Sequence, residues 1–431
     1  MSTDNEDEVR GDSSHINWIT QALTTARPQA IAALLRYFRD LDTAEEAFQE
    51  ACLRALKNWP VKGPPRDPTA WLILVGRNFA LDEARRRRKQ QALPDDEEIS
   101  DLEDVETDLV ERLDSSHYRD DVLRLLFICC HPDLPATQQV ALALRIVSGL
   151  TVKEIARAFL VKEDAMQQRI TRAKNRVAEA KVPFENPGPA ERAERLVTVS
   201  AMIYLLFNEG YSASGGDTHV RVSLCAEAIR LARILLHLFP DEGEIMGLTA
   251  LLLLQHARAD ARLDAHGAII LLEDQDRTLW NQDLIAEGLA LVEKAFRARR
   301  PGRYQVQAAI AAMHAQAPRP QDTDWAEIDR LYAILESIQP SPVVTLNRAV
   351  AVSKLHGAAA ALAMIEPLAE PLSGYFHFFG LKGALLLELK RSEEARVAFN
   401  QAIALANTAA EAAHIRLHLD KLMAESKTKA S

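Results

Sequence analysis

The stretch Leu150-Thr-Val-Lys-Glu-Ile-Ala-Arg-Ala-Phe-Leu-Val-Lys-Glu-Asp-Ala-Met-Gln-Gln-Arg-Ile-Thr-Arg-Ala-Lys174 predicts two short helices joined by a turn. Thr151 is followed three residues later by Glu154, the spacing of a capping box, so we expect the first helix to begin there. Ile155 and Phe159 lie four residues apart and form the apolar side of this helix. The turn is expected around Leu160 and Val161.

The second helix of this stretch is apolar on one side and polar and basic on the other. Four residues recur at helical spacing and should pack inward: Met166, Ile170, Ala173 and Val177. Most side chains suited to base edges or phosphates lie away from this apolar face. We expect DNA contacts from Gln167, Gln168, Arg169, Thr171, Arg172, Lys174 and Arg176. The pattern predicts a helix-turn-helix, with an ordinary helical hairpin and a solvated face as the alternative.

The composition predicts a soluble, almost wholly helical protein. The chain has 431 residues, 48% hydrophobic and 26% charged, and alanine and leucine dominate. The formal net charge of −10 argues against a nucleic-acid partner, but the charge is segregated. Residues 77–89 hold six basic residues, and residues 95–108 hold nine acids and no base. Separated basic and acidic segments indicate more than the net charge does.

Breaks in the pattern divide the chain into six expected parts. They are a disordered N-terminus (1–14), a helical unit (15–91), an acidic linker (92–116), a second helical unit with the helix-turn-helix (117–181), a helical extension (190–315) and repeats (320–425). In the first unit we expect helices near 16–26, 29–39 and 43–56. A loop rich in proline and glycine (57–68) and a long helix (69–91) follow.

The repeats are predicted from large and small apolar residues near the C-terminus. Phe379, Gly383, Leu386, Ala395, Phe399 and Ala402 fit the pattern of a tetratricopeptide unit. A weaker copy lies 35 residues earlier in the sequence. In it Ala360 aligns with Ala395, and Met364 aligns with Phe399. Such a period is typical of stacked helical hairpins, and generic helical packing is the alternative.

The sequence gives little indication of metal, disulfide or membrane chemistry. The four cysteines Cys52, Cys129, Cys130 and Cys225 lack the spacing of a zinc site or a disulfide framework, so we expect them to pack in the core. The apolar runs are too short to span a bilayer, and no signal peptide is visible. We therefore expect a cytoplasmic protein without a metal or cofactor.

Three segments together resemble a bacterial RNA polymerase sigma factor of the extracytoplasmic-function group, a subgroup of which has a tetratricopeptide-like C-terminal extension. They are Asp42-Thr-Ala-Glu-Glu-Ala-Phe-Gln-Glu-Ala-Cys-Leu-Arg-Ala-Leu56, Ala70-Trp-Leu-Ile-Leu-Val-Gly-Arg-Asn-Phe-Ala-Leu-Asp-Glu-Ala-Arg-Arg-Arg-Arg88 and the helix-turn-helix. The resemblance covers residues 15–181. The segments 207–211, 256–262 and 272–280 are similar to the extension of that subgroup.

The resemblance implies sigma region 2 at 15–91, sigma region 4 at 117–181, and two partners, core RNA polymerase and promoter DNA. The helix-turn-helix would read the minus-thirty-five element, with Gln168 and Arg172 as the foremost base contacts. Contacts to the minus-ten element and upstream DNA would come from Asn58, Trp59, Lys62, Arg66, Arg77, Asn78, Arg85, Arg86, Arg87 and Arg88. Trp59 serves equally well as a core residue, because a rigid loop suits either role. Two departures from the family stand in the motif, where Leu160 replaces a glycine and Asp164 brings an acid near the groove.

By the same resemblance, the acidic face of residues 42–56 would bind the polymerase through Asp42, Glu45, Glu46, Gln49 and Glu50. A solvated helix surface is the alternative reading of this face, which we expect to point away from Ala47, Leu53 and Leu56. The acidic linker would thread basic channels of the polymerase, or serve as an extended spacer. The C-terminal extension would act as an intramolecular regulator.

Two other functions compete with this interpretation. Six C-terminal residues could bind a metal or perform acid–base catalysis, namely His256, Asp260, Asp264, Glu273, Asp274 and Asp276. Arg258, Arg262 and Arg277 lie among them, so an internal salt-bridge network explains the same residues, and we expect no enzyme. A conventional helix-turn-helix regulator would act without polymerase and would not need the first helical unit.

Overall fold

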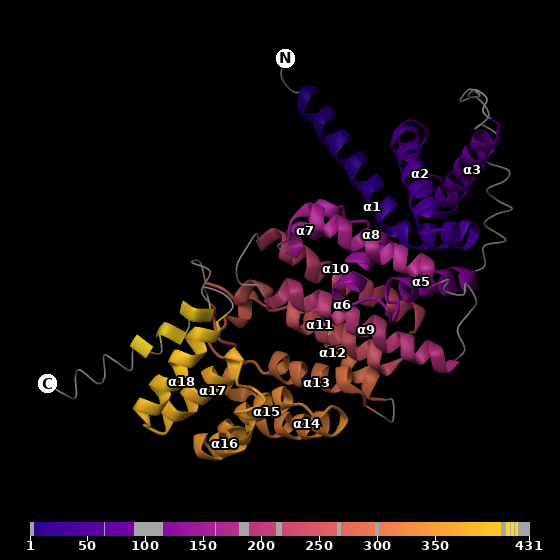
Figure 1. Cartoon of the computed structure of the whole chain (residues 1–431). Helices are drawn as coiled ribbons and strands as arrows, with labels where there is room; N and C mark the ends of the chain where they lie inside the picture. The colour runs from indigo at the N-terminus through magenta and orange to yellow at the C-terminus, as the bar shows by residue number, and fades with distance from the viewer. Residues whose placement is uncertain are drawn as a thin grey trace. The chain divides into compact units, whose positions relative to one another are not determined.

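The computed structural model describes residues 4–63, 65–89, 115–159, 161–180, 189–212, 218–264, 269–297, 301–406, 411–413, 415–417 and 419–420. These residues form an all-α fold, which confirms the predicted fold class (Figure 1). The chain divides into two compact units, Met1–Leu205 and Leu206–Ser431. The boundary falls within α9 (Pro189–Ser212) rather than at the proline-rich segment before it.

The first unit begins with three helices that contact one another, here called the N-terminal bundle. They are α1 (Asp4–Phe38), α2 (Leu41–Lys62) and α3 (Pro68–Lys89). The two helices expected at 16–26 and 29–39 are one, because α1 continues through Pro28. An internal proline costs about 3 kcal/mol in a helix, and burial of apolar residues on both sides of it, such as Ala26 and Ile31, offsets that cost. Helix α1 begins at Asp4, within the segment 1–14 that was expected to be disordered.

Helix α2 begins earlier and ends later than predicted. Its N-cap is Asp40, whose Oδ1 accepts a hydrogen bond from the Thr43 backbone nitrogen at 2.7 Å, so Thr43 does not start the helix. The helix passes through Pro60 and ends at Gly63, which has a left-handed φ of 83°. The loop predicted at 57–68 is therefore much shorter.

The helix-turn-helix bundle follows, with α5 (Ser115–Cys129), α6 (Ala136–Ala143), a π-turn (Leu144–Ser148), α7 (Val152–Ala158) and α8 (Glu163–Glu179). Helix α1 contacts both α5 and the π-turn, so the two bundles form one unit. Cys129 and Cys130 are buried in α5 and at its end, as expected, and burial raises the pKa of the Cys129 thiol to about 12.

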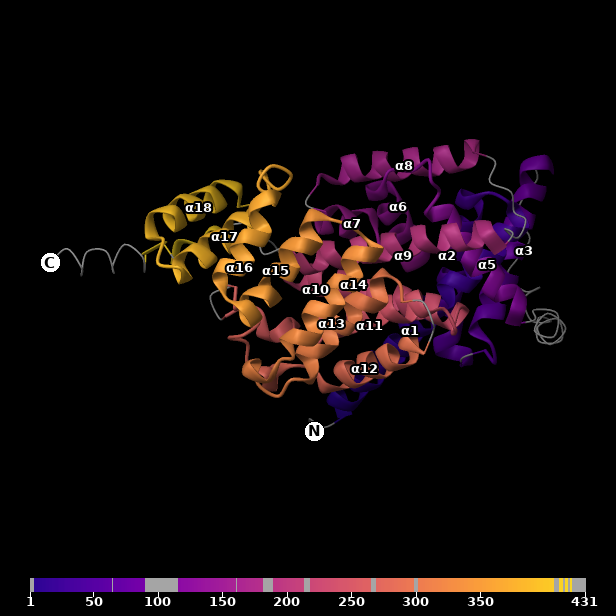
Figure 2. The ribbon, with the colours of Figure 1, turned by 90° about the horizontal axis from the view of Figure 1, so that it is seen from below.

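The second unit is a succession of helices in which neighbours along the chain pack together (Figure 2). They are α10 (Thr218–Leu238), α11 (Gly243–His256), α12 (Gln282–Phe296), α13 (Arg303–Gln316), α14 (Trp325–Ile338), α15 (Pro342–His356), α16 (Ala358–Ile365), α17 (Phe376–Glu388) and α18 (Ser392–Leu405). Helix α13 packs on α14, and Val306 shares a hydrophobic cluster with Leu331. The break expected between 315 and 320 therefore does not separate two cores.

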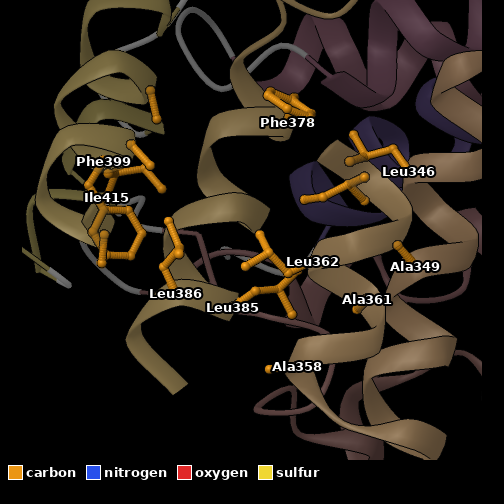
Figure 3. Close-up of a cluster of buried hydrophobic side chains, with 14 of the residues drawn as sticks. Leu346, Ala349, Ala358, Ala361, Leu362, Phe378, Leu385, Leu386, Phe399 and Ile415 are labelled. Atoms are coloured by element: carbon orange, nitrogen blue, oxygen red, sulfur yellow. The ribbon is translucent and has the colours of Figure 1, made fainter. Parts of the chain in front are cut away.

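The last four helices form two hairpins whose equivalent helices begin 34 residues apart, at Pro342 and Phe376. This spacing corrects the 35-residue alignment by one position. Ala361 and Ile365 have no exposed surface and lie 34 residues before Ala395 and Phe399, whereas Ala360 is exposed. The hairpins share one hydrophobic cluster, shown in Figure 3.

Helices α17 and α18 approach each other closely at Gly383. A Cβ atom there would lie 2.5 Å from Cδ1 and Cε1 of the Phe399 ring, closer than packed atoms approach. Phe399 is 1% exposed and cannot move without opening the cluster. Only glycine therefore fits this position.

We predict that Gly383→Ala lowers the free energy of unfolding of the second unit by about 1–3 kcal/mol through overpacking. Gly380→Ala is the matched control, because its Cβ would make ordinary contact with Ile415 at 3.5 Å and alanine favours a helix. Urea unfolding followed by circular dichroism measures both variants. Equal stability of the two would contradict the proposed close approach.

Candidate functional site

The helix-turn-helix is built as its sequence predicts. The Glu154 backbone nitrogen donates to Thr151 Oγ1 at 3.2 Å, and the Thr151 backbone nitrogen donates to Glu154 Oε2 at 2.7 Å. Both halves of the capping box are therefore present and fix the start of α7. Ile155 is fully buried. Leu160, at the expected turn, lies outside the described residues.

Helix α8 buries the predicted apolar face and exposes much of the predicted DNA face. Met166, Ile170, Ala173 and Val177 are buried. The exposed members of the predicted set are Gln167, Gln168, Thr171, Arg172 and Arg176, while Arg169 and Lys174 are half-buried. Asp164 is exposed in the first turn, where an acid favours the helix dipole, so its position fits a helix start.

Lys174 contacts the N-terminal bundle. Its Nζ lies 2.6 Å from Asp42 Oδ1 and 2.9 Å from Glu45 Oε2, both on α2. Burial lowers the pKa of Lys174, but hydrogen bonds to these two carboxylates outweigh it, and the pKa is raised above its usual value. In this arrangement the ammonium is held by protein and is not directed to a phosphate.

The acidic face of α2 differs from the prediction at Glu45. This carboxylate is 4% exposed, and Arg145 Nη2 of the π-turn lies 2.6 Å from its Oε1. Asp42, Glu46 and Gln49 are exposed, and Glu50 pairs with Arg54 at 3.1 Å.

Two leucines expected on the inner side of α2 lie at its surface. Leu53 is 55% exposed and Leu56 is 49% exposed. Together with Glu46 and Gln49 they recur every three or four residues, so all four lie on one exposed stripe. The sequence already contained this signal, since positions 46, 49, 53 and 56 follow the three- and four-residue spacing of one helix face. Exposed leucines at this spacing mark a candidate contact surface.

Trp59 is a core residue in this structure. It is 3% exposed, with its ring stacked on Trp18 at 5.9 Å and edge-on to Trp71 at 5.4 Å. The prediction that Trp59 contacts a base is therefore corrected here, because helix α2 continues past it and turns the ring inward. Among the other residues of this segment, Asn58 is half-buried, and Lys62 and Arg66 are exposed.

The basic end of α3 is described only in part. The Arg77 guanidinium lies over the Tyr37 ring at 5.4 Å, and Asn78 is half-buried. The backbone of Arg85, Arg86, Arg87 and Arg88 belongs to α3, but their side chains lie outside the described part.

The charged C-terminal residues are arranged differently from the expected salt-bridge network. Arg258 donates to the Tyr211 hydroxyl at 2.7 Å, and Arg262 donates to the Tyr211 carbonyl at 2.8 Å. Arg277 donates to two main-chain carbonyls, and Glu273 pairs with Lys354 at 2.8 Å. Among the described residues, no three His, Cys, Asp or Glu side chains are placed to hold a metal. Nor is any described helix both long and apolar enough to cross a membrane.

Comparison with known proteins matches both bundles. Residues 23–90 match sigma-70 region 2, and residues 124–177 match sigma-70 region 4. Residues 195–296 match a family of unknown function, DUF6596. An uncharacterized protein of Rhizobium meliloti (strain 1021) is 67% identical over 411 residues, covering 95% of this chain and 97% of that protein.

Proposed function

We propose that this chain, which belongs to the sigma-70 family of RNA polymerase sigma factors, reads the promoter with α8 and binds core polymerase through α2 under control of its own C-terminal unit. The observation that carries the proposal is the presence of both sigma regions in order, with the region 4 motif correctly capped and its polar face exposed. A conventional regulator without polymerase would leave region 2 unexplained.

Promoter reading is assigned to the exposed face of α8. Gln168 and Arg172 are both exposed and lie one helical turn apart, so both can reach one groove. Glutamine and arginine make bidentate contacts with adenine and guanine edges. The arginines of α3 would supply phosphate contacts, which position the protein without reading sequence.

We predict that Arg172→Ala and Gln168→Ala each relax discrimination at one position of the minus-thirty-five element, at a cost of about 1–3 kcal/mol. Arg157→Ala is the control, because it removes the same charge from an exposed position on α7. Run-off transcription with core polymerase on promoters varied at single positions measures the effect. If discrimination is unchanged in both variants, α8 does not read bases.

Polymerase binding is assigned to the exposed stripe of α2. An interface core is usually apolar with a polar rim, and Leu53 and Leu56 with Glu46 and Gln49 supply both. The Glu46 carboxylate matches a basic partner surface, whereas the leucines supply the area removed from water. We therefore include the two leucines in the docking surface and leave out Glu45, which is buried.

We predict that Leu53→Ser combined with Leu56→Ser weakens binding to core polymerase about tenfold or more, as expected for central interface residues. Val61→Ser is the control, because Val61 is 85% exposed in the same helix but lies off the stripe. Fluorescence anisotropy of labelled protein titrated with core polymerase gives both affinities. Equal affinities would place the docking surface elsewhere.

Regulation in cis is assigned to the C-terminal unit. The two hairpins with a 34-residue spacing support a tetratricopeptide-like interpretation, and such solenoids are commonly binding surfaces. Most of α9, up to Leu205, already belongs to the first unit, where Arg195 lies over the Phe127 ring of α5 at 5.4 Å. The extension is thus joined to region 4 by a packed helix, consistent with the subgroup of extracytoplasmic-function factors that the sequence resembles.

We predict that removing the C-terminal unit changes the rate or the promoter choice of transcription. Truncation after residue 212 retains α9, whereas truncation after residue 185 also removes its contact with α5. Comparing the two with the full chain in run-off assays separates the effect of the solenoid from that of α9. An unchanged rate and promoter choice in both truncations would refute regulation in cis.

A further inference from the structure

The second unit contains a cavity of about 780 Å³, lined by α13, α14, α15, α17 and the segment 271–277 that precedes α12. Every residue that lines it belongs to the second unit. Its volume falls within the roughly 300–1,000 Å³ that is typical of small-molecule sites. None of its residues takes part in the proposed contacts with promoter DNA or polymerase, so the cavity is left without a role by that function.

Most of the cavity wall is apolar or aromatic. Trp325 and Tyr332 of α14 line it and are half-buried, and the Trp325 ring lies edge-on to His314 of α13 at 5.4 Å. A flat apolar body placed against these rings would remove their surface from water. The aliphatic part of the wall consists of Leu271, Leu272, Ile328, Val350, Leu381 and Leu385.

Two cations line the cavity next to this aromatic wall. Lys354 Nζ lies 6.0 Å from the centre of the Trp325 ring. Arg277 donates through Nη1 to the backbone carbonyl of His314 at 2.6 Å, and the His314 ring in turn contacts Trp325. Both cations are therefore tied to the aromatic wall, one directly and one through His314.

Arg277 makes no ion pair with any described residue. Its Nη1 donates to the carbonyls of His314 and Ala317, both at 2.6 Å, and its Nε is buried without an acceptor. The carboxylate of Asp322 acts on Arg277 only at a distance and is already paired with Arg319 at 2.8 Å. The charge of Arg277 is thus left for an anion in the cavity to neutralise.

The surroundings of Arg277 add to the positive potential. Burial, with smaller contributions from the charges of Arg258 and Arg277, lowers the pKa of His314 to about 4. Burial and the charge of Arg258 also lower the pKa of Arg277. His314 is therefore neutral at neutral pH, and the cations that keep it so favour a negative group at the same wall.

Two carboxylates also line the cavity, and each has a distinct consequence. Glu273 pairs with Lys354 at 2.8 Å, but about half of each side chain is exposed, and such a pair adds little stability. A ligand carboxylate can therefore take the place of Glu273 on Lys354. Glu388 of α17 is half-buried and repels an anion, so its removal should strengthen anion binding.

We propose that this cavity binds a small carboxylic acid with a flat apolar body, whose carboxylate is held by Arg277 and Lys354 and whose body packs on Trp325 and Tyr332. The inference deepens the proposed regulation in cis and rests on it for its consequence, because the cavity lies wholly within the regulatory unit. A bound acid ties the segment 271–277 to α14 and α15 and so favours one conformation of the unit.

Calorimetric titration of the full-length protein with three probes that share one apolar body tests the site. The probes are naphthaleneacetate, its neutral amide naphthaleneacetamide, and the cation naphthylmethylamine. The acid should bind about tenfold more tightly than the amide, because it adds charge-assisted hydrogen bonds, and the amine should bind more weakly still. Equal or tighter binding of the amide or the amine overturns the proposal, and so does failure of the acid to bind.

Charge variants locate the carboxylate. Lys354→Gln should weaken binding of naphthaleneacetate about tenfold and leave binding of the amide unchanged. Lys382→Gln is the matched control, because it removes the same charge from α17 at a position outside the cavity. Glu388→Gln should bind the acid more tightly than the unmodified chain. Equal affinity of the two lysine variants for the acid overturns the assignment.

A cavity-filling variant tests the location without removing a charge. Ala384 lines the cavity from an exposed position on α17, so Ala384→Phe should abolish binding of all three probes while circular dichroism shows an intact fold. Undiminished binding to Ala384→Phe overturns the site.

Run-off transcription with core polymerase, measured on the same preparations, separates the two proposals. A chain that binds the acid but does not transcribe with core polymerase supports the site and rejects the proposed function. A chain that transcribes but does not bind the acid rejects the site alone.

Discussion

The carboxylate of Glu45 is the constraint on which the arrangement of the first unit depends. A charge this deeply buried is stable only where cations replace its water. Here the cations are Arg27 of α1, Arg145 of the π-turn and Lys174 of α8. Arg27 also passes close to Gly149, whose φ is 79° and where a Cβ would lie 2.8 Å from the Arg27 side chain. Glycine at this position therefore serves both the backbone conformation before the helix-turn-helix and the approach of the arginine.

Apolar packing forms the cores of the second unit, and ion pairs such as Arg348 to Asp329 also join its helices. Its helices approach closely where small residues allow it, as at Gly383 against Phe399 and at Gly247, where a Cβ would lie 2.5 Å from the Gln305 backbone. Helix α15 contributes Ala351 to the cluster at Val306 and Leu346 to the next cluster, so the two neighbouring cores share one helix.

Sequence reasoning succeeded where residues close together in the chain decide the structure. The capping box at Thr151, the buried face of α8 and the all-α class were predicted correctly because each depends on residues three or four apart. The boundary expected near Pro28 was wrong because burial of Ala26 and Ile31 on either side offsets the local cost of that proline. Helix α2 also continues through Pro60, although Val61 beyond it is exposed. The repeat register was wrong by one residue, because small alanines on adjacent positions give the pattern little contrast.

By itself the sequence determined the helical class, the sigma-like order of motifs, the helix-turn-helix and the polar face of its second helix, because local periodicity and capping encode them. Only the tertiary structure decided that Trp59 is buried, that Leu53 and Leu56 are exposed, and that Lys174 pairs with α2. These outcomes depend on which surfaces meet in the folded chain, across 132 residues in the case of Lys174 and Asp42. A helical wheel shows which residues share a face, but not which face finds a partner.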